Sequence, residues 1–253
     1  MSEPGVQRQA IRALHRWRLP LTWLALLLVL TLGMAELESV FRWIETESRQ
    51  VIYDRADFVT LLGRHLLVVM VASLLATLIG VSAAIAVTRR AGRDFLPLVA
   101  QIASMGQTFP PVAVLALAVP VLGFGTLPII VALLLYGLLP IVRNTLAGLQ
   151  GIEPSILEAA RGMGMSRGQV LRQVELPLAA PVILAGIRTS VTVNIATAAL
   201  GATVGASNLG DPIISGIVNG NTAYILQGAL MIGLLALTVD STFERLTRRQ
   251  VSR

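Results

Sequence analysis

The sequence of 253 residues contains no cysteine and no lysine, and it has only two histidines. Without cysteine the chain can form neither disulfides nor thiolate-bound metal sites. A Walker-type phosphate-binding loop ends in a lysine, so the chain supplies no ATPase site of its own. His15 and His65 alone give almost none of the nucleophile, base and metal groups that a hydrolase needs. The composition therefore argues against an enzyme, and we expect no cofactor bound by this chain.

Charge is also scarce. Charged residues make up 13% of the chain, against about 25% in soluble domains. Hydrophobic residues make up 55% and the mean hydropathy is +0.75. Most of the surface should therefore face lipid, as in a single membrane domain. The net charge of +6 comes from arginine, and the positive-inside rule accounts for it without a nucleic-acid partner.

Six hydrophobic segments predict an all-α membrane protein with about six transmembrane helices, since a span needs about 20 apolar residues. The segments are 19–34, 66–87, 95–122, 126–142, 178–200 and 223–243. The third contains Pro97, Pro110, Pro111 and Pro120. Proline removes a backbone donor and clashes with the preceding turn, so this segment should be bent or broken.

The arginines predict the orientation. With six spans, 15 of the 20 arginines fall on one side of the membrane, while loop 35–65 on the other side carries four arginines and six carboxylates. The arginine-rich side should be the cytoplasm, so both termini are expected there. The predicted organisation is a cytoplasmic tail, a first span, a periplasmic loop, a core transmembrane domain that includes a cytoplasmic loop, and a second tail. Their ranges are 1–18, 19–34, 35–65, 66–243 with loop 151–177, and 244–253.

Two features of the N-terminal part leave alternatives open. The first segment, followed by Gly33-Met34-Ala35, could be a cleaved signal peptide. We favour an uncleaved anchor, because the arginine-rich leader is long and the cleavage signal is weak. Apolar residues within 40–44 predict a short amphipathic helix that rests on the outer interface or touches a soluble partner.

Loop 151–177 is the most informative polar stretch. Pro154 suits the first position of a helix, where its missing N–H is not needed. The apolar residues of this helix recur at helical spacing and are Ile156, Ala160 and Met163. Gly162 and Gly164 should break the helix and permit a tight turn.

A second short helix should follow the turn. Ser166 and Gln169 form a capping-box pattern. The apolar stripe of this helix is Val170, Leu171 and Val174, and we expect Leu176-Pro177 to end it. A helix pair of this size cannot fold alone, so it should dock on its own spans, on another protein, or on both.

Glu158-Ala159-Ala160, followed by Gly164 and then by Leu176-Pro177, resembles the EAA loop of bacterial ABC-importer permeases. The resemblance implies the architecture of a type I ABC-importer permease in the bacterial inner membrane. In that family the loop supplies the coupling helix that sits in a groove of a cytoplasmic ATPase subunit. The residues that the resemblance assigns to coupling are Glu158, Ala159, Ala160, Gly162, Gly164, Leu176 and Pro177.

Further motifs resemble the permeases of osmoprotectant importers, which carry glycine betaine, proline betaine, carnitine or choline. They lie at 106–111, 119–125, 136–145 and 185–189. This resemblance implies a second permease subunit, identical or paralogous, a periplasmic substrate-binding protein, and ATP and Mg²⁺ held by the partner ATPase. Ser207-Asn208 stands where many relatives have two glycines, which puts the outer loop after the fifth span in doubt.

Polar residues within the hydrophobic segments could line a translocation path, because polar groups in hydrocarbon usually face a water-filled route. The candidates are Gln107, Thr108, Pro110, Pro111, Ser190, Asn194 and Thr197. Hydrogen bonding between helices explains Ser190, Asn194 and Thr197 equally well. The aromatic residues are dispersed, so the sequence shows no cage for a quaternary ammonium ion. This fits a permease that receives its substrate from a separate binding protein.

Two rival functions remain. The solute could instead be an amino acid or an oxyanion, against which the third-segment motif argues. An ion-coupled secondary transporter could also use six spans with polar midplane residues. The cytoplasmic two-helix loop argues against it, since a self-powered transporter has no use for a docking element of this kind.

Overall fold

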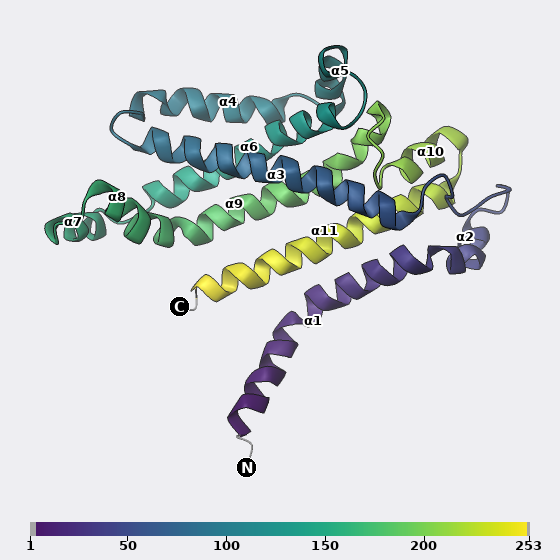
Figure 1. The fold of residues 1–253 in the computed structure, drawn as a ribbon, viewed down its shortest axis with the longest axis horizontal. Helices are drawn as coiled ribbons and strands as arrows, with labels where there is room; N and C mark the ends of the chain where they lie inside the picture. The colour runs from purple at the N-terminus through teal and green to yellow at the C-terminus, as the bar shows by residue number, and fades with distance from the viewer. Residues whose placement is uncertain (1–3, 252–253) are drawn as a thin grey trace. The chain divides into compact units, whose positions relative to one another are not determined.

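The computed structural model describes residues 4–251, which are nearly all helical and include no strand (Figure 1). This confirms the all-α expectation. The chain divides into two compact units. One comprises Met1–Leu67 with Ala198–Arg253, and the other comprises Val68–Thr197.

Five helical stretches of the described residues are long and apolar enough to cross a membrane. They are Trp17–Ile44, Phe58–Thr88, Thr126–Gln150, Arg167–Val204 and Thr222–Thr247. The third predicted segment instead forms two shorter helices, α4 (Leu96–Thr108) and α5 (Pro111–Leu122). Phe109 and Pro110 between them are extended, with ψ near 139° and 138°. Each precedes a proline, which disfavours the helical conformation. The predicted break is confirmed, and it is why five continuous helices stand where six segments were expected.

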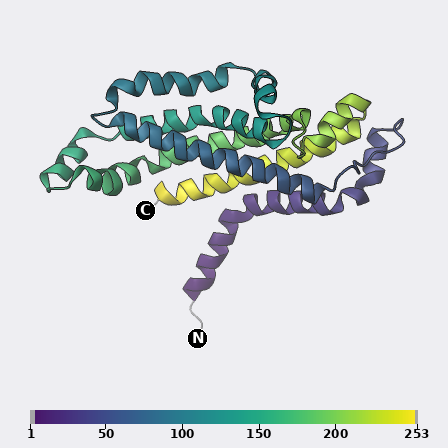
Figure 2. The same ribbon diagram turned by 45° about the horizontal axis from the view of Figure 1, so that its top comes forward.

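The unit Val68–Thr197 is built around α6 (Thr126–Gln150) and α9 (Leu176–Thr197), with most of α3 (Phe58–Thr88) and α4 beside them (Figure 1). Small residues let α6 and α9 approach closely. A Cβ added at Gly186 would lie 2.7 Å from the carbonyl oxygen of Pro140. Apolar side chains of α3, α4 and α6 fill the contact between these helices, among them Val87, Ala103 and Val142. The loop helices α7 and α8 lie at one end of this unit and α5 at the other (Figure 2).

The other unit contains α1 (Pro4–Gly33), the 3₁₀ turn η1 (Met34–Leu37), α2 (Glu38–Ile44), α10 (Asp211–Asn219) and α11 (Thr222–Val251). Both α1 and α10 pack on α11. The short helix expected near residues 40–44 is confirmed as α2, with Phe41 buried and Trp43 exposed.

Asn208 organises the segment that joins the 3₁₀ helix η4 (Ala198–Val204) to α10. Its buried amide donates to the carbonyl oxygens of Ala198 and Ala206 and accepts the N–H of Gly210. The side chain therefore satisfies three backbone groups that a glycine would leave without this partner. Ser207 and Asn208 thus do not weaken this turn. The helix α10 that follows was not predicted, although Asp211-Pro212 is a common helix start.

Candidate functional site: the loop between α6 and α9

The first helix of the loop is α7 (Pro154–Gly162), which begins at the expected proline. Ala160 is buried against the unit, whereas Ile156 and Met163 are exposed. The predicted apolar face is therefore divided, because Met163 lies just beyond the end of the helix and Ala160 points inward. Glu158 and Ala159 are exposed as well. The outer side of α7 thus offers apolar and acidic groups to solvent or to a partner.

The turn after α7 follows the prediction. Gly164 has a φ of +82°, a left-handed conformation that favours glycine. Its N–H donates to the carbonyl oxygen of Arg161 at 2.9 Å. Ser166 and Gln169 then form the expected capping box, each side chain bonding the backbone N–H of the other. Gly162 is the last residue of α7, so the two glycines have different conformational roles.

The expectation that Leu176-Pro177 ends the second helix is wrong. The short helix α8 (Arg167–Val170) passes through a π-helical turn, Leu171–Glu175, directly into α9. The N–H of Leu176 donates to the carbonyl oxygen of Leu171, five residues earlier. Pro177 has no N–H to continue the α-helical pattern, and the wider turn accommodates this loss without ending the helix. Leu176 and Pro177 therefore lie in the first turn of α9, and the loop continues into that helix without a break.

An ion pair ties this junction to α3. A guanidinium nitrogen of Arg89 lies 2.6 Å from a carboxylate oxygen of Glu175, and the two side chains are 36% and 10% exposed. Arg89 also donates to Thr88 and to the carbonyl oxygen of Ile85. A carboxylate this buried requires a partner. We did not predict this pair, although opposite charges beside the ends of two segments on one side of the membrane could have indicated it.

The path candidates of α9 lie inside the unit. Ser190 and Asn194 are fully buried, and the Asn194 amide donates to the Ser73 hydroxyl of α3 at 3.0 Å. A Cβ at Gly137 of α6 would lie 2.6 Å from the Ser190 hydroxyl. Thr197, the last residue of α9, is half-buried. Ser190 and Asn194 thus lie where α3, α6 and α9 meet.

The other path candidates, Gln107, Thr108, Pro110 and Pro111, lie at the break between α4 and α5. The Gln107 side chain donates to the carbonyl oxygen of Tyr136 at 3.0 Å, and the Tyr136 hydroxyl donates to the carbonyl oxygen of Phe109. Tyr136 therefore holds the break against α6, while the next residue, Gly137, faces Ser190. The candidates at the break and the candidates on α9 therefore lie next to the same turn of α6, which contains Tyr136 and Gly137. Ser73 was not predicted from the sequence, and Tyr136 and Gly137 entered only as part of the 136–145 motif, with no role assigned to either.

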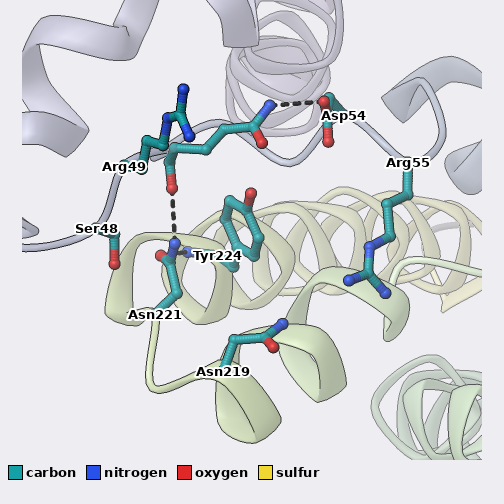
Figure 3. A pocket seen from close by; sticks show the side chains of 8 residues that line it. Ser48, Arg49, Asp54, Arg55, Asn219, Asn221 and Tyr224 are labelled. Atoms are coloured by element: carbon teal, nitrogen blue, oxygen red, sulfur yellow. Dashed lines mark hydrogen bonds between the residues drawn. The ribbon is translucent and has the colours of Figure 1, made fainter.

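The unit that contains the termini has a pocket of about 260 Å³ between the 45–57 loop and the turn from α10 to α11 (Figure 3). Its lining is polar and comprises Ser48, Arg49, Gln50, Asp54, Arg55, Asn219, Asn221 and Tyr224. Hydrogen bonds join Gln50 to Asp54 and Asn221 to the backbone of Gln50. Beside it, the N–H of Thr222 donates to Glu45 at 2.9 Å and lowers the pKa of that carboxyl. The pocket holds charges of both signs and therefore favours neither cations nor anions.

Helices that are long and apolar enough to cross a membrane, joined by an exposed two-helix loop, define a helical membrane protein. Residues 76–252 match the family described as "Binding-protein-dependent transport system inner membrane component", and the chain belongs to this family. It is 43% identical over 223 residues to the osmoprotectant import permease protein OsmY of Salmonella typhimurium, covering 87% of this chain and 92% of that protein. It is 38% identical over 190 residues to the glycine betaine/carnitine/choline transport system permease protein OpuCB of Bacillus subtilis, covering 75% and 86%.

Solved structures agree on the fold. A chain of the MetNI methionine ABC transporter in an inward-facing conformation aligns with a TM-score of 0.67 at 23% identity, covering 76% of this chain and 95% of that one. A chain of an amino acid ABC transporter aligns with a TM-score of 0.64 at 20% identity. The chain is therefore an inner-membrane permease component of an ABC importer and not an enzyme. An importer of this family works with an ATPase and a substrate-binding protein.

Proposed function

We propose that this permease imports an osmoprotectant, such as glycine betaine, proline betaine or a choline-type quaternary ammonium solute. The observation that carries the proposal is the 43% identity to an osmoprotectant import permease across 92% of its length, joined by the glycine betaine/carnitine/choline permease of Bacillus subtilis. Two permease subunits, identical or paralogous, form the pore, with both termini of each chain in the cytoplasm. An amino acid or an oxyanion is the rival cargo.

Uptake in proteoliposomes tests the cargo. The permease is reconstituted with its cognate ATPase and binding protein, and uptake of radiolabelled glycine betaine is measured with and without ATP. Unlabelled proline betaine or choline should compete, whereas histidine and sulfate should not. If none of the quaternary ammonium solutes competes, the proposed substrate class is wrong.

Loop 151–177 is the proposed docking element for the ATPase, with ATP and Mg²⁺ bound by that partner. The exposed outer side of α7 supports this role, because Glu158 and Ala159 are exposed on the helix and Met163, directly after its end, is 76% exposed. Ile156 is exposed on the same helix, and exposed apolar side chains that form a patch rimmed by polar groups mark interaction sites. Since α8 continues into α9, closure of the ATPase dimer would move a transmembrane helix directly.

A matched pair of substitutions tests the docking. Met163→Asp should abolish co-purification of the ATPase, because it places a carboxylate in the proposed contact. Val218→Asp is the control, since Val218 is 77% exposed and lies on α10, on the opposite side of the membrane in the proposed topology. Equal ATPase recovery with both variants would refute the assignment of the loop.

The proposed translocation path passes Gln107, Thr108, Pro110 and Pro111 at the break and Ser190, Asn194 and Thr197 on α9. The Ser190 hydroxyl and the Asn194 carbonyl oxygen support it, since they have no hydrogen-bond partner among the described residues and are costly to leave in hydrocarbon. The chain has no cysteine, so Ser190→Cys gives a unique label site. Its reaction with a water-soluble thiol reagent should rise during turnover, while Ala179→Cys in the buried core stays unreactive. Equal protection of both would favour interhelical hydrogen bonding instead.

A further inference from the structure

A second, larger pocket lies on the inner side of the loop, in the unit Val68–Thr197. It has a volume of about 910 Å³ and is lined by residues from the end of α3, the start of α4, the end of α6, and α7, α8 and the π-helical turn. It therefore opens where two of the helices that can cross a membrane, α3 and α6, come to an end. This is the same end of the unit at which α7 and α8 lie (Figure 2).

The charge of this pocket is strongly one-sided. Five arginines line it, namely Arg89, Arg90, Arg93, Arg161 and Arg167. Among the described residues of the lining, the only carboxylate is Glu175, which already pairs with Arg89. The other carboxylates of these elements, Asp94, Glu153 and Glu158, do not line it. Within the described part of the chain, no ion pair engages the remaining four arginines. Arginines gathered in one pocket repel each other, and an anion between them would relieve that repulsion.

Most of the remaining lining is apolar, with Thr88 and Gln150 as its polar side chains. Val87, Leu96 and Leu149 are among the pocket residues beside the arginines. Guanidinium groups bind phosphate oxygens through paired hydrogen bonds, and an apolar wall beside them suits the first methylenes of the acyl chains of a lipid. Basic pockets between helices at the cytoplasmic side of a membrane bind anionic headgroups. A soluble phosphate would use the arginines but would leave the apolar wall without a partner.

We propose that this pocket binds the phosphate headgroup of an anionic phospholipid of the cytoplasmic leaflet. The lipid would lie on the inner side of α7, opposite the exposed side proposed to contact the ATPase. Its phosphate would link arginines of the segment after α3 with arginines of α7 and α8. The inference rests on the topology of the proposed function, but binding can be measured on the full-length permease alone, without uptake or ATP hydrolysis.

The test compares two double variants that remove the same charge. Arg93→Gln/Arg167→Gln takes two arginines from the pocket and spares Arg89. Arg143→Gln/Arg172→Gln removes two exposed arginines that do not line it. Each purified protein is titrated in detergent with phosphatidylglycerol, phosphatidylcholine or inorganic phosphate, and binding is followed by native mass spectrometry and thermal shift. Phosphatidylglycerol should bind the pocket variant more weakly, on the order of 30-fold, as expected for the loss of two arginine–phosphate contacts. The control should bind like the wild type, and phosphatidylcholine should bind none of them tightly.

Three results would overturn the proposal. Equal phosphatidylglycerol affinity of both variants would mean that only the general surface charge matters. An equal thermal shift with inorganic phosphate would make the site one for free anions. Loss of ATPase co-purification by the pocket variant, with lipid binding intact, would assign the arginines to an acidic segment of the ATPase. Arg93→Lys/Arg167→Lys keeps the charge and should retain much of the binding, which separates lost contacts from misfolding.

Discussion

The turn at Gly164 offers a sharp test of how the loop works, because a second glycine two residues earlier serves as its control. A Cβ at either Gly162 or Gly164 would meet no atom within 4 Å. The two positions therefore differ only in their backbone, since Gly164 has a φ of +82° and Gly162 ends α7 in a helical conformation. Any difference between alanine variants must come from backbone strain.

The two alanine substitutions should change the stability of the turn in opposite directions. At Gly164, alanine must adopt a left-handed conformation, which costs about 1–2 kcal/mol. At Gly162, alanine fits the helix and should stabilise the turn by about 0.4–1 kcal/mol, because it restricts the unfolded chain. Gly164→Asn should lie between them, since asparagine tolerates the left-handed region. The strain should open the turn locally, since the helices around it are held by their own packing.

Two measurements check these magnitudes. Hydrogen exchange of the amides in 160–170 should accelerate by about tenfold in Gly164→Ala, slow in Gly162→Ala, and be intermediate in Gly164→Asn. In proteoliposomes with the ATPase and binding protein, the number of solutes imported per ATP should be lowest for Gly164→Ala, intermediate for Gly164→Asn and highest for Gly162→Ala. Identical exchange in the two alanine variants would refute the idea that the left-handed turn holds the loop. Faster exchange with a normal number of solutes imported per ATP would show that the turn does not affect transport.

Three further changes have defined outcomes. Gly186→Val places a side chain against the Pro140 carbonyl, which cannot rotate away, so it should destabilise the purified permease by about 3 kcal/mol. As a control, Gly63→Val has nothing within 4 Å of the added Cβ and should leave the melting temperature nearly unchanged. Glu175→Gln should lower the melting temperature by leaving its arginine unpaired, and adding Arg89→Gln should then cost less than it does in the wild type, a coupling that a double-mutant cycle measures. The N–H of Thr222 lowers the pKa of Glu45 in the folded chain. The contribution of the ionised Glu45 carboxylate to stability is therefore present above its ordinary pKa of 4.5 and is lost as the pH falls below that value. The melting temperature of Glu45→Gln should therefore change less between pH 7 and pH 4 than that of the wild type.

The elements that could be predicted from sequence are those with local causes. Pro110 and Pro111 break the third segment because each restricts its own neighbourhood, and the Ser166–Gln169 capping box needs only four residues. The errors involve non-local packing or a balance of local effects. Pro177 was expected to end a helix, but the π-helical turn accommodates it within a helix that packs along α6.

The same distinction applies to the site. Glu158 and Gly164 were proposed from their spacing, whereas Arg89 and Glu175 lie 86 positions apart and come together only when α3 and α9 pack. Periodicity predicted one polar face for Ser190, Asn194 and Thr197, but it could not show that α3 and α6 cover Ser190 and Asn194. Of their packing partners, Ser73 is an ordinary residue for a membrane helix with no local signal, and Gly137 lies in the 136–145 motif, which does not indicate what it packs against.

If loop 151–177 contacts the ATPase as proposed, the continuity of α8 with α9 limits how its motion can reach the membrane part. If the helix had ended at Pro177, the loop could rotate against the membrane part like a hinge, and its motion would reach the spans only through side-chain contacts. Because the backbone hydrogen bonds run through the π-helical turn, a displacement of α8 along the axis must move the start of α9 as well. The buried Glu175, held by Arg89, resists separation of this junction from α3. The two helices are therefore expected to move together at this end, so that the motion reaches the buried contact of Asn194 with Ser73, which joins the same two helices further along.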